Sequence, residues 1–368
     1  MISNNKLKAV IVGCGRIGKN HVFAYLESGR YEIVGLCDVR PESMLEFDEA
    51  FSGIEGYSPI HFTEPGAMFK DTSPDVVSVA VWDGLHAPNV ELAAFHGVRG
   101  ILCEKPMSDS IKSAAEMINN CLEKGAKLAI GHQRRFLPSY NLARDMILNG
   151  EIGEVRLLTA FARDGLPNYS SHISDTFRYL LGDPDCEWVM GNVERKTDQW
   201  ARSVPIEDRA IAMFGFTNGV QASILSGLTD YDGFWGRVYG SDGMIEFTVS
   251  DVKIMNTKKC GWALHKPDGN YANHGTDDVS FEMLEGSVAQ ATEFARWVSG
   301  EIKDYRNDAI NGYKALEMVH AVYESARTYS RVTIPMENKE NPLRMMIDSG
   351  QLPVLSEGKY DIRQVDCH

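Results

Sequence analysis

The sequence predicts an α/β protein with two domains, a doubly wound α/β domain followed by an α+β domain with an open, mostly antiparallel sheet. Up to about residue 130, short apolar runs alternate with longer helical stretches. A glycine-rich turn lies between the first apolar run and the first helical stretch. After Pro138, apolar and polar residues alternate within runs that turn signals join, which favours antiparallel strands.

Five runs in the first third are predicted strands of a parallel sheet. Their residues are apolar throughout, which is typical of strands that helices cover on both faces. The runs are Leu7–Val12, Ile33–Cys37, Val76–Val81, Gly100–Cys103 and Leu128–Ile130. Pro41 opens one intervening helix, and residues 109–124 place their apolar side chains on one face of another.

The second domain is predicted from alternating runs and from turns. A helix from Pro138 to Asn149 precedes the runs Val155–Phe161, Ala210–Phe216 and Ala222–Leu228. The turn sequences Thr217-Asn218-Gly219 and Ser241-Asp242-Gly243 indicate that neighbouring strands are antiparallel.

Two helices, at about 286–299 and 309–329, are expected to complete this domain. From Pro335 onward Pro, Gly and charged residues dominate, so we expect an irregular arm that wraps its own body or a neighbouring subunit. The predicted segments are a dinucleotide-binding domain (1–131), a substrate and oligomerisation domain (132–334) and the arm (335–368).

Composition excludes several classes of function. The 368 residues carry 37 Lys+Arg and 51 Asp+Glu, a net charge of −14, which argues against nucleic acid and anionic membranes as partners. No apolar run approaches the ~20 residues of a membrane span, and the first residues lack a signal-peptide layout, so we expect a cytoplasmic protein. Seven cysteines without a C-x-x-C, and histidines without ligand spacing (132, 265 and 274), predict no disulfide framework and no metal.

The run Gly13-Cys14-Gly15-Arg16-Ile17-Gly18 predicts a dinucleotide site of the Rossmann type. Gly13 allows the tight turn, Gly15 lets the backbone approach a pyrophosphate, and Gly18 lets the helix lie close to the strand. The N-terminus of the following helix then offers free N–H groups to the phosphates.

Asp38 ends the next predicted strand, twenty residues after Gly18, where a carboxylate accepts hydrogen bonds from the adenosine ribose. An acidic side chain there disfavours a 2′-phosphate, so NAD is the expected cofactor. Arg40 is positioned to pair with such a phosphate, and NADP therefore stays open.

A second motif, Cys103-Glu104-Lys105-Pro106, stands at the end of the fifth predicted strand. Ligands of open parallel sheets bind at the carboxyl ends of the strands, which places Lys105 beside the nicotinamide. Together with the fingerprint, with 79–86 and with 131–136, this motif makes the chain resemble the Gfo/Idh/MocA oxidoreductases, which include glucose-fructose oxidoreductase and inositol dehydrogenase. The resemblance covers residues 6 to about 330.

The resemblance implies hydride transfer between NAD(P) and a secondary alcohol of a cyclic sugar, glycoside or inositol. It also suggests a cis peptide bond between Lys105 and Pro106. The residues expected to contact the cofactor are Gly13, Gly15, Arg16, Ile17, Gly18, Asp38, Arg40, Trp82, His86, Glu104, Lys105 and Gln133.

The family's second signature, Asp-x-Gly-x-His-x-x-Asp, matches 168–175 with His172 and Asp175 in place. Asn168 replaces the first Asp, so its amide can orient the histidine but adds no charge. Ser170 replaces the Gly, and Trp82-Asp83 stands where the family usually has Thr-Pro.

His172 is the expected base for the hydroxyl proton. We expect it near a helix N-terminus that Ser170 and Ser171 cap, where the helix field favours a neutral imidazole. Lys105 is assigned to positioning and electrostatic stabilisation, with base as its alternative role.

Further residues are expected to bind or orient the substrate. Asn168, Asp175, Arg163 and Tyr169 are assigned to this role, and residues 231–235 and Trp262 offer further aromatic platforms. Two alternatives stay open: a non-catalytic dinucleotide-binding sensor, and a family variant that uses bound NAD transiently in glycoside cleavage. We expect a homo-oligomer, because the second face of an open sheet is apolar surface to bury.

Overall fold

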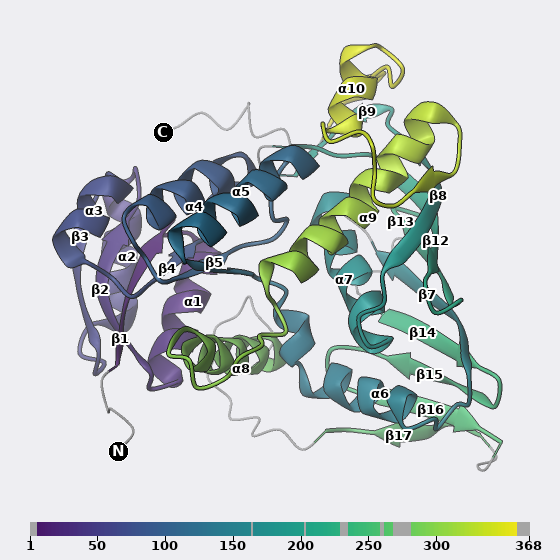
Figure 1. Cartoon of the computed structure of the whole chain (residues 1–368), viewed down its shortest axis with the longest axis horizontal. Coiled ribbons are helices and arrows are strands. Elements are labelled where there is room, and N and C mark those ends of the chain that lie inside the picture. The colour runs from purple at the N-terminus through teal and green to yellow at the C-terminus, as the bar shows by residue number, and fades with distance from the viewer. Residues whose placement is uncertain are drawn as a thin grey trace. The chain divides into compact units, whose positions relative to one another are not determined.

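The computed structural model describes residues 6–162, 165–201, 204–228, 235–257, 261–267 and 281–358. The chain divides into two compact units (Figure 1). One comprises residues 1–108, 113–136 and 273–312, and the other comprises 109–112, 137–272 and 313–368. Each is described by itself.

The first unit is built on a six-stranded parallel sheet with the order β3-β2-β1-β4-β5-β6. This order and direction confirm the predicted doubly wound domain. The strands are β1 (Leu7–Val12), β2 (Tyr31–Cys37), β3 (Tyr57–Phe62), β4 (Val76–Val79), β5 (Gly100–Cys103) and β6 (Lys127–Ile130).

Helices connect these strands (Figure 1). They are α1 (Arg16–Glu27), α2 (Pro41–Phe51), α3 (Pro65–Thr72), α4 (His86–Phe95) and α5 (Ile111–Lys124), with short 3₁₀ turns η1 (Asp83–Leu85) and η2 (Gln133–Phe136). Strand β3 is not among the predicted strands, because its residues are partly exposed along one edge of the sheet and form no continuous apolar run.

A helix from late in the sequence completes the first unit. Helix α8 (Phe281–Val298) packs against α1 (Figure 1). The Tyr31 hydroxyl donates to the carbonyl of Ala291 at 2.6 Å, and the buried Phe294 ring lies 5.8 Å from the Tyr305 ring. This helix therefore belongs to the hydrophobic core of the parallel sheet.

The second unit contains a nine-stranded sheet with the order β17-β16-β15-β14-β7-β13-β12-β8-β18. All neighbours are antiparallel except β7 and β13, and both predicted turns join antiparallel strands. The strands are β7 (Val155–Ala162), β8 (Cys186–Glu194), β12 (Arg209–Phe216), β13 (Gln221–Ser226), β14 (Trp235–Gly240), β15 (Gly243–Phe247), β16 (Val252–Asn256), β17 (Ala263–His265) and β18 (Val332–Thr333).

Helices cover one face of this sheet. Helix α6 (Pro138–Leu148) packs on β15 and β16, and α9 (Ala309–Thr328) approaches β8 so closely that a Cβ at Gly191 would lie 2.7 Å from Val322. A π-helical turn, η3 (Leu166–Ser170), runs into α7 (Ser171–Leu180).

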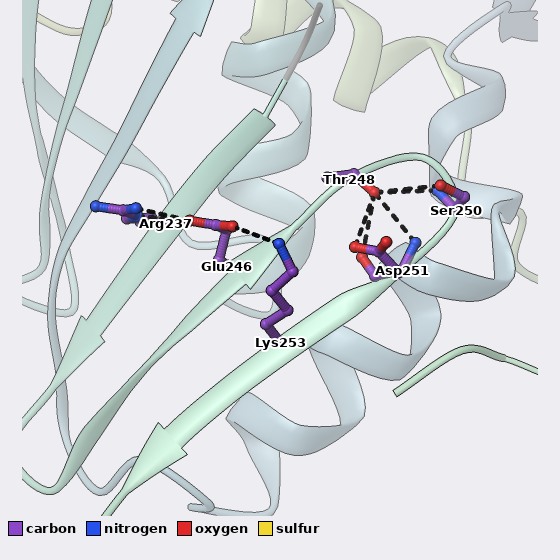
Figure 2. A network of polar contacts seen from close by, with 6 residues as sticks. All are labelled: Arg237, Glu246, Thr248, Ser250, Asp251 and Lys253. Carbon is purple, nitrogen blue, oxygen red and sulfur yellow. Dashed lines mark hydrogen bonds and ion pairs between the residues drawn. The ribbon is translucent and has the colours of Figure 1, made fainter. Parts of the chain in front are cut away.

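The opposite face, which we call the outer face, carries one row of side chains across seven strands. In register from β8 to β16 the row reads Met190, Met213, Ser223, Thr159, Arg237, Glu246 and Lys253. Its apolar end is exposed, with Met190 at 54% and Met213 at 42%. At its other end Glu246 pairs with Arg237 at 2.7 Å and with Lys253 at 3.2 Å (Figure 2).

The arm wraps its own unit in the part that the structure describes. The buried Glu317 carboxylate accepts the N–H of Met336, and α10 (Pro342–Asp348) follows. Short strand β19 (Ser356–Glu357) then pairs with β9 (Thr197–Asp198). A small hairpin of β10 (Trp200–Ala201) and β11 (Val204–Pro205) leads toward β12.

We predict that Phe294→Ala lowers the free energy of unfolding by about 3–5 kcal/mol, because it leaves a cavity at a side chain with 0% exposure. The control is Phe95→Ala in the same unit, whose ring is 71% exposed and whose loss costs less than about 1 kcal/mol. Urea unfolding of both variants measures the difference. Equal losses would show that α8 is not part of the core.

Candidate functional site

The fingerprint turn follows β1 and is shaped by two of its glycines. Gly13 has a φ of +98°, and a Cβ there would lie 2.5 Å from the carbonyl oxygen of Ala80. A Cβ at Gly18 would lie 2.2 Å from the carbonyl oxygen of Gly13. Gly15 has nothing within 4 Å of its Cβ position, so the fold does not require this glycine. Its bare backbone leaves room for a phosphate group.

Asp38 connects the end of β2 to this turn. Its Oδ2 accepts the N–H of Cys14 at 2.8 Å, and its Oδ1 accepts the N–H of Arg40 at 2.9 Å. Each oxygen keeps a further lone pair, and the side chain is 12% exposed. The Arg40 guanidinium lies 3.9 Å from Oδ1 and is largely exposed. These residues fit a dinucleotide with a free ribose 2′-hydroxyl.

The other predicted cofactor residues of the first unit lie at the carboxyl ends of its strands. Arg16 is exposed and Ile17 is half-buried in the first turn of α1, Trp82 is exposed after β4, and Gln133 is half-buried after β6. His86 is wholly buried, with Nδ1 2.9 Å from the Pro106 carbonyl and Nε2 3.1 Å from the Val81 carbonyl. Its ring therefore ties the loop after β4 to the loop after β5.

Lys105 lies buried at the end of β5, next to a fixed carboxylate. Oε1 of Glu104 contacts His21 Nε2 at 3.0 Å, and Oε2 accepts the N–H of Lys105 at 3.2 Å. A Cβ at Gly131 would lie 2.5 Å from Oε1, so the carboxylate occupies that space. The Lys105–Pro106 peptide bond is cis, as the resemblance suggested.

His21 is a site residue that the sequence analysis missed. It lies three residues after Gly18 on α1, and both His21 and Glu104 are buried. A histidine on the buried face of the helix after a fingerprint was the available signal, because buried polar side chains require a partner.

The second unit holds the remaining predicted residues. Asn168 and Tyr169 are half-buried in η3, and His172 and Asp175 are buried in the first turn and a half of α7. Arg163, residues 231–234 and His274 lie outside the described residues. Trp262 is exposed before β17.

The predicted serine caps on the His172 helix are wrong. No side chain caps α7: Ser171 Oγ donates to the carbonyl of Asn168 at 2.9 Å, and Ser170 has helical backbone angles of −73° and −17°. The physical reason is that η3 continues directly into α7, so the helical backbone begins at Leu166. Counted from Leu166, His172 lies in the second helical turn. The helix field is strongest in the first turn, so His172 lies outside that region.

Glu207 is a second residue that the sequence analysis missed. Its side chain is wholly buried before β12, where Oε1 accepts the N–H of Leu166 at 2.6 Å and Oε2 accepts the Tyr323 hydroxyl at 2.5 Å. Burial raises the pKa of this carboxyl from 4.5 to about 7. Nothing near Glu207 in the sequence signals these partners.

Among the described residues, no group of three or more His, Cys, Asp or Glu side chains is arranged to hold a metal ion. No helix in the described part of the chain is both long and apolar enough to cross a membrane.

The parallel sheet and the fingerprint turn define the class of dinucleotide-binding proteins, and comparison with known families identifies the family. Residues 7–132 match the NAD-binding Rossmann fold of the Gfo/Idh/MocA oxidoreductase family. Residues 144–334 match the C-terminal alpha/beta domain of the same family. The chain belongs to this family of NAD-binding oxidoreductases.

Relatives span nearly the whole chain. D-glucoside 3-dehydrogenase of Escherichia coli K12 is 23% identical over 366 residues, which cover 90% of this chain and 99% of the relative. Levoglucosan dehydrogenase with NADH and levoglucosan is similar in structure, with a TM-score of 0.76, 19% identity and coverage of 90% and 100%. An inositol dehydrogenase homologue from Azotobacter vinelandii with NADH and myo-inositol has a TM-score of 0.76, 18% identity and coverage of 89% and 98%.

We predict that Asp38→Ala weakens NAD binding more than NADP binding, because only NAD presents a ribose 2′-hydroxyl to the carboxylate. Titration of each reduced cofactor by its fluorescence measures the two dissociation constants. Asp71→Ala in α3 serves as the control and leaves both unchanged. Equal weakening of both cofactors would assign Asp38 to the turn at Cys14 and not to the ribose.

Proposed function

We propose that this oxidoreductase transfers a hydride between NAD and a secondary alcohol carbon of a cyclic sugar, glycoside or inositol, with Lys105 and His172 as its catalytic residues. The observation that carries the proposal is the buried Lys105 at the end of β5, beside a carboxylate fixed by His21. Ligands of open parallel sheets bind at the carboxyl ends of the strands, which is where this lysine lies. Bound NAD supplies the hydride acceptor, and NADP is the alternative that Arg40 leaves open.

Lys105 orients the substrate hydroxyl and stabilises the negative charge that develops on its oxygen. An ammonium group donates hydrogen bonds and carries positive charge, which suits it to this task. The contacts of Glu104 with His21 and with the Lys105 backbone support the position of this lysine. Proton acceptance by Lys105 is its alternative role.

His172 accepts the hydroxyl proton on a ring nitrogen. Asp175 lies one helical turn later and Asn168 one turn earlier, and this spacing supports a role for both in orienting the imidazole. Because Asn168 is neutral, it adds no charge that would stabilise imidazolium. Tyr169 offers a flat face to a sugar ring, and Arg163 is assigned to a substrate hydroxyl.

The substrate class is supported by the relatives. The matched enzymes are named for a D-glucoside, levoglucosan and myo-inositol, which all present secondary hydroxyl groups on a ring.

The protein is proposed to be a cytoplasmic homo-oligomer. The cysteines at 14, 37, 103, 121 and 186 are free, which suits a reducing compartment. The outer face supports the oligomer, because Met190, Met213 and Ile211 are exposed beside one another on β8 and β12.

We predict that Lys105→Ala lowers kcat by about 10²–10⁴ while NADH affinity stays within about tenfold. Absorbance at 340 nm is followed with methyl D-glucoside, levoglucosan and myo-inositol. Lys112→Ala, an exposed lysine on α5, is the control and retains activity. No turnover of any ring alcohol by the wild type, with NADH still bound, would instead support a dinucleotide sensor.

We predict that Met213→Asp dissociates the oligomer, because it places a charge within the apolar end of the outer face. Light scattering after gel filtration gives the mass, which falls toward 41.0 kDa in the variant. Leu122→Asp, an exposed apolar position on α5, leaves the mass unchanged. A wild type of 41.0 kDa would contradict the oligomer.

A further inference from the structure

We propose that Glu207 is a positioning residue that holds the turn carrying Asn168 and Tyr169, and that protonation of its carboxyl group controls how readily this turn opens. The link to substrate binding rests on the proposed function, because it takes η3 and His172 as parts of the substrate site. The control of turn opening is a property of the second unit alone.

Glu207 caps the N-terminus of η3 from a distant part of the chain. Leu166 is the first residue of the turn, and its N–H donates to Oε1 at 2.6 Å. The preceding Gly165 has no side chain to cap the turn, and its φ of +74° places its Cβ position 3.0 Å from Ile206. Residues 165–166 therefore rest directly on 206–207, and the start of η3 cannot move without breaking this contact.

The second carboxylate oxygen of Glu207, Oε2, is hydrogen-bonded to a different element. The hydroxyl of Tyr323 on α9 donates to Oε2 at 2.5 Å, and both side chains are buried. The carboxyl group thus bridges η3 and α9. If Glu207 moved, the N–H of Leu166 would lose its partner within the protein interior, and an unsatisfied buried donor disfavours that movement.

The charged groups around Glu207 do not cancel the effect of burial on the pKa of its carboxyl group. Tyr323 faces it from α9, and the adjacent Asp208 is a like charge that raises its pKa further. Arg195 contacts the same loop through the carbonyl of Ile206 and pairs with Asp198. Burial is the largest effect, and it raises the pKa of Glu207 to about 7.

The opening of η3 depends on pH because the pKa of Glu207 differs between the closed and the open turn. The pKa is about 7 when the turn is closed and returns toward 4.5 when opening admits water. A raised pKa in the closed state means that closure is most favourable below 4.5 and loses this contribution as the pH rises through 7. Ionisation therefore favours opening. Between pH 6 and pH 8 the opening equilibrium changes by about tenfold.

Hydrogen exchange of residues 166–172 in the full chain tests this directly, without substrate or cofactor. After correction for intrinsic exchange rates, protection in the wild type falls about tenfold from pH 6 to pH 8. In Glu207→Gln the amide oxygen still accepts from Leu166 and the amide nitrogen can donate to Tyr323, so the segment stays protected and the pH dependence disappears. Glu187→Gln, an exposed residue on β8, keeps the wild-type profile.

A second variant changes the midpoint and keeps the carboxyl group. Tyr323→Phe removes a hydrogen bond that lowers the pKa of Glu207, so the midpoint of the protection profile moves to higher pH. A wild-type profile without pH dependence, or one that Glu207→Gln leaves unchanged, overturns the proposal. A change spread over the whole chain would also overturn it, because it would indicate global unfolding.

Substrate binding is measured separately with the ring alcohols named above. Glu207→Ala raises KM about tenfold and leaves NADH affinity within twofold, since the fingerprint belongs to the other unit. Failure of Lys105→Ala to reduce kcat would contradict the proposed function and leave the exchange result standing. A pH-dependent turn with an unchanged KM would contradict only the role of Glu207 in substrate positioning.

Discussion

The Glu104 carboxylate is the constraint on which the first half of the site depends. A buried carboxylate must be hydrogen-bonded, and its contacts come from three elements: His21 on α1, the backbone of Lys105 after β5, and the space that Gly131 leaves after β6. These contacts form only when the strands are in register and α1 lies close to β1, which Gly18 permits. The fingerprint and the lysine motif are therefore coupled parts of one arrangement, although they are far apart in the sequence.

Some features of the fold and the site could be predicted from the sequence, and others could not. Continuous apolar runs identified β1 and β5 at their observed bounds, because burial on both faces leaves a local record in composition. Glu207 left no such record, since its partners are 41 and 116 residues away. The position of His21 on the buried face of α1 was a local signal, but its partner Glu104 is 83 residues away. The serine caps were wrong for a related reason: the π-helical turn before α7 depends on support from Glu207, which no local pattern shows.

Helix α8 is a second example of a feature that the sequence pattern does not specify. Its helical period was recognised, but an amphipathic pattern does not specify which sheet its apolar face covers. Specific contacts determine which sheet α8 covers: the Tyr31 hydroxyl donates to the carbonyl of Ala291, and the Phe294 ring packs beside the Tyr305 ring. Residues 281–298 thereby return to the unit in which the chain began, and the core behind the fingerprint is closed by a segment from the far end of the sequence.

Asp38 and Glu207 show how two similar carboxylates acquire different tasks. Each accepts a backbone N–H at the start of a turn, but Asp38 is partly exposed and each of its oxygens keeps a further lone pair. Glu207 is wholly buried, and both of its oxygens are taken by donors of the protein. An oxygen with an exposed lone pair can accept a hydrogen bond from a ligand. An oxygen whose acceptor capacity is taken by donors of the protein supports the structure only. Solvent exposure therefore suits Asp38 to the proposed recognition of the ribose, and burial suits Glu207 to support of the turn.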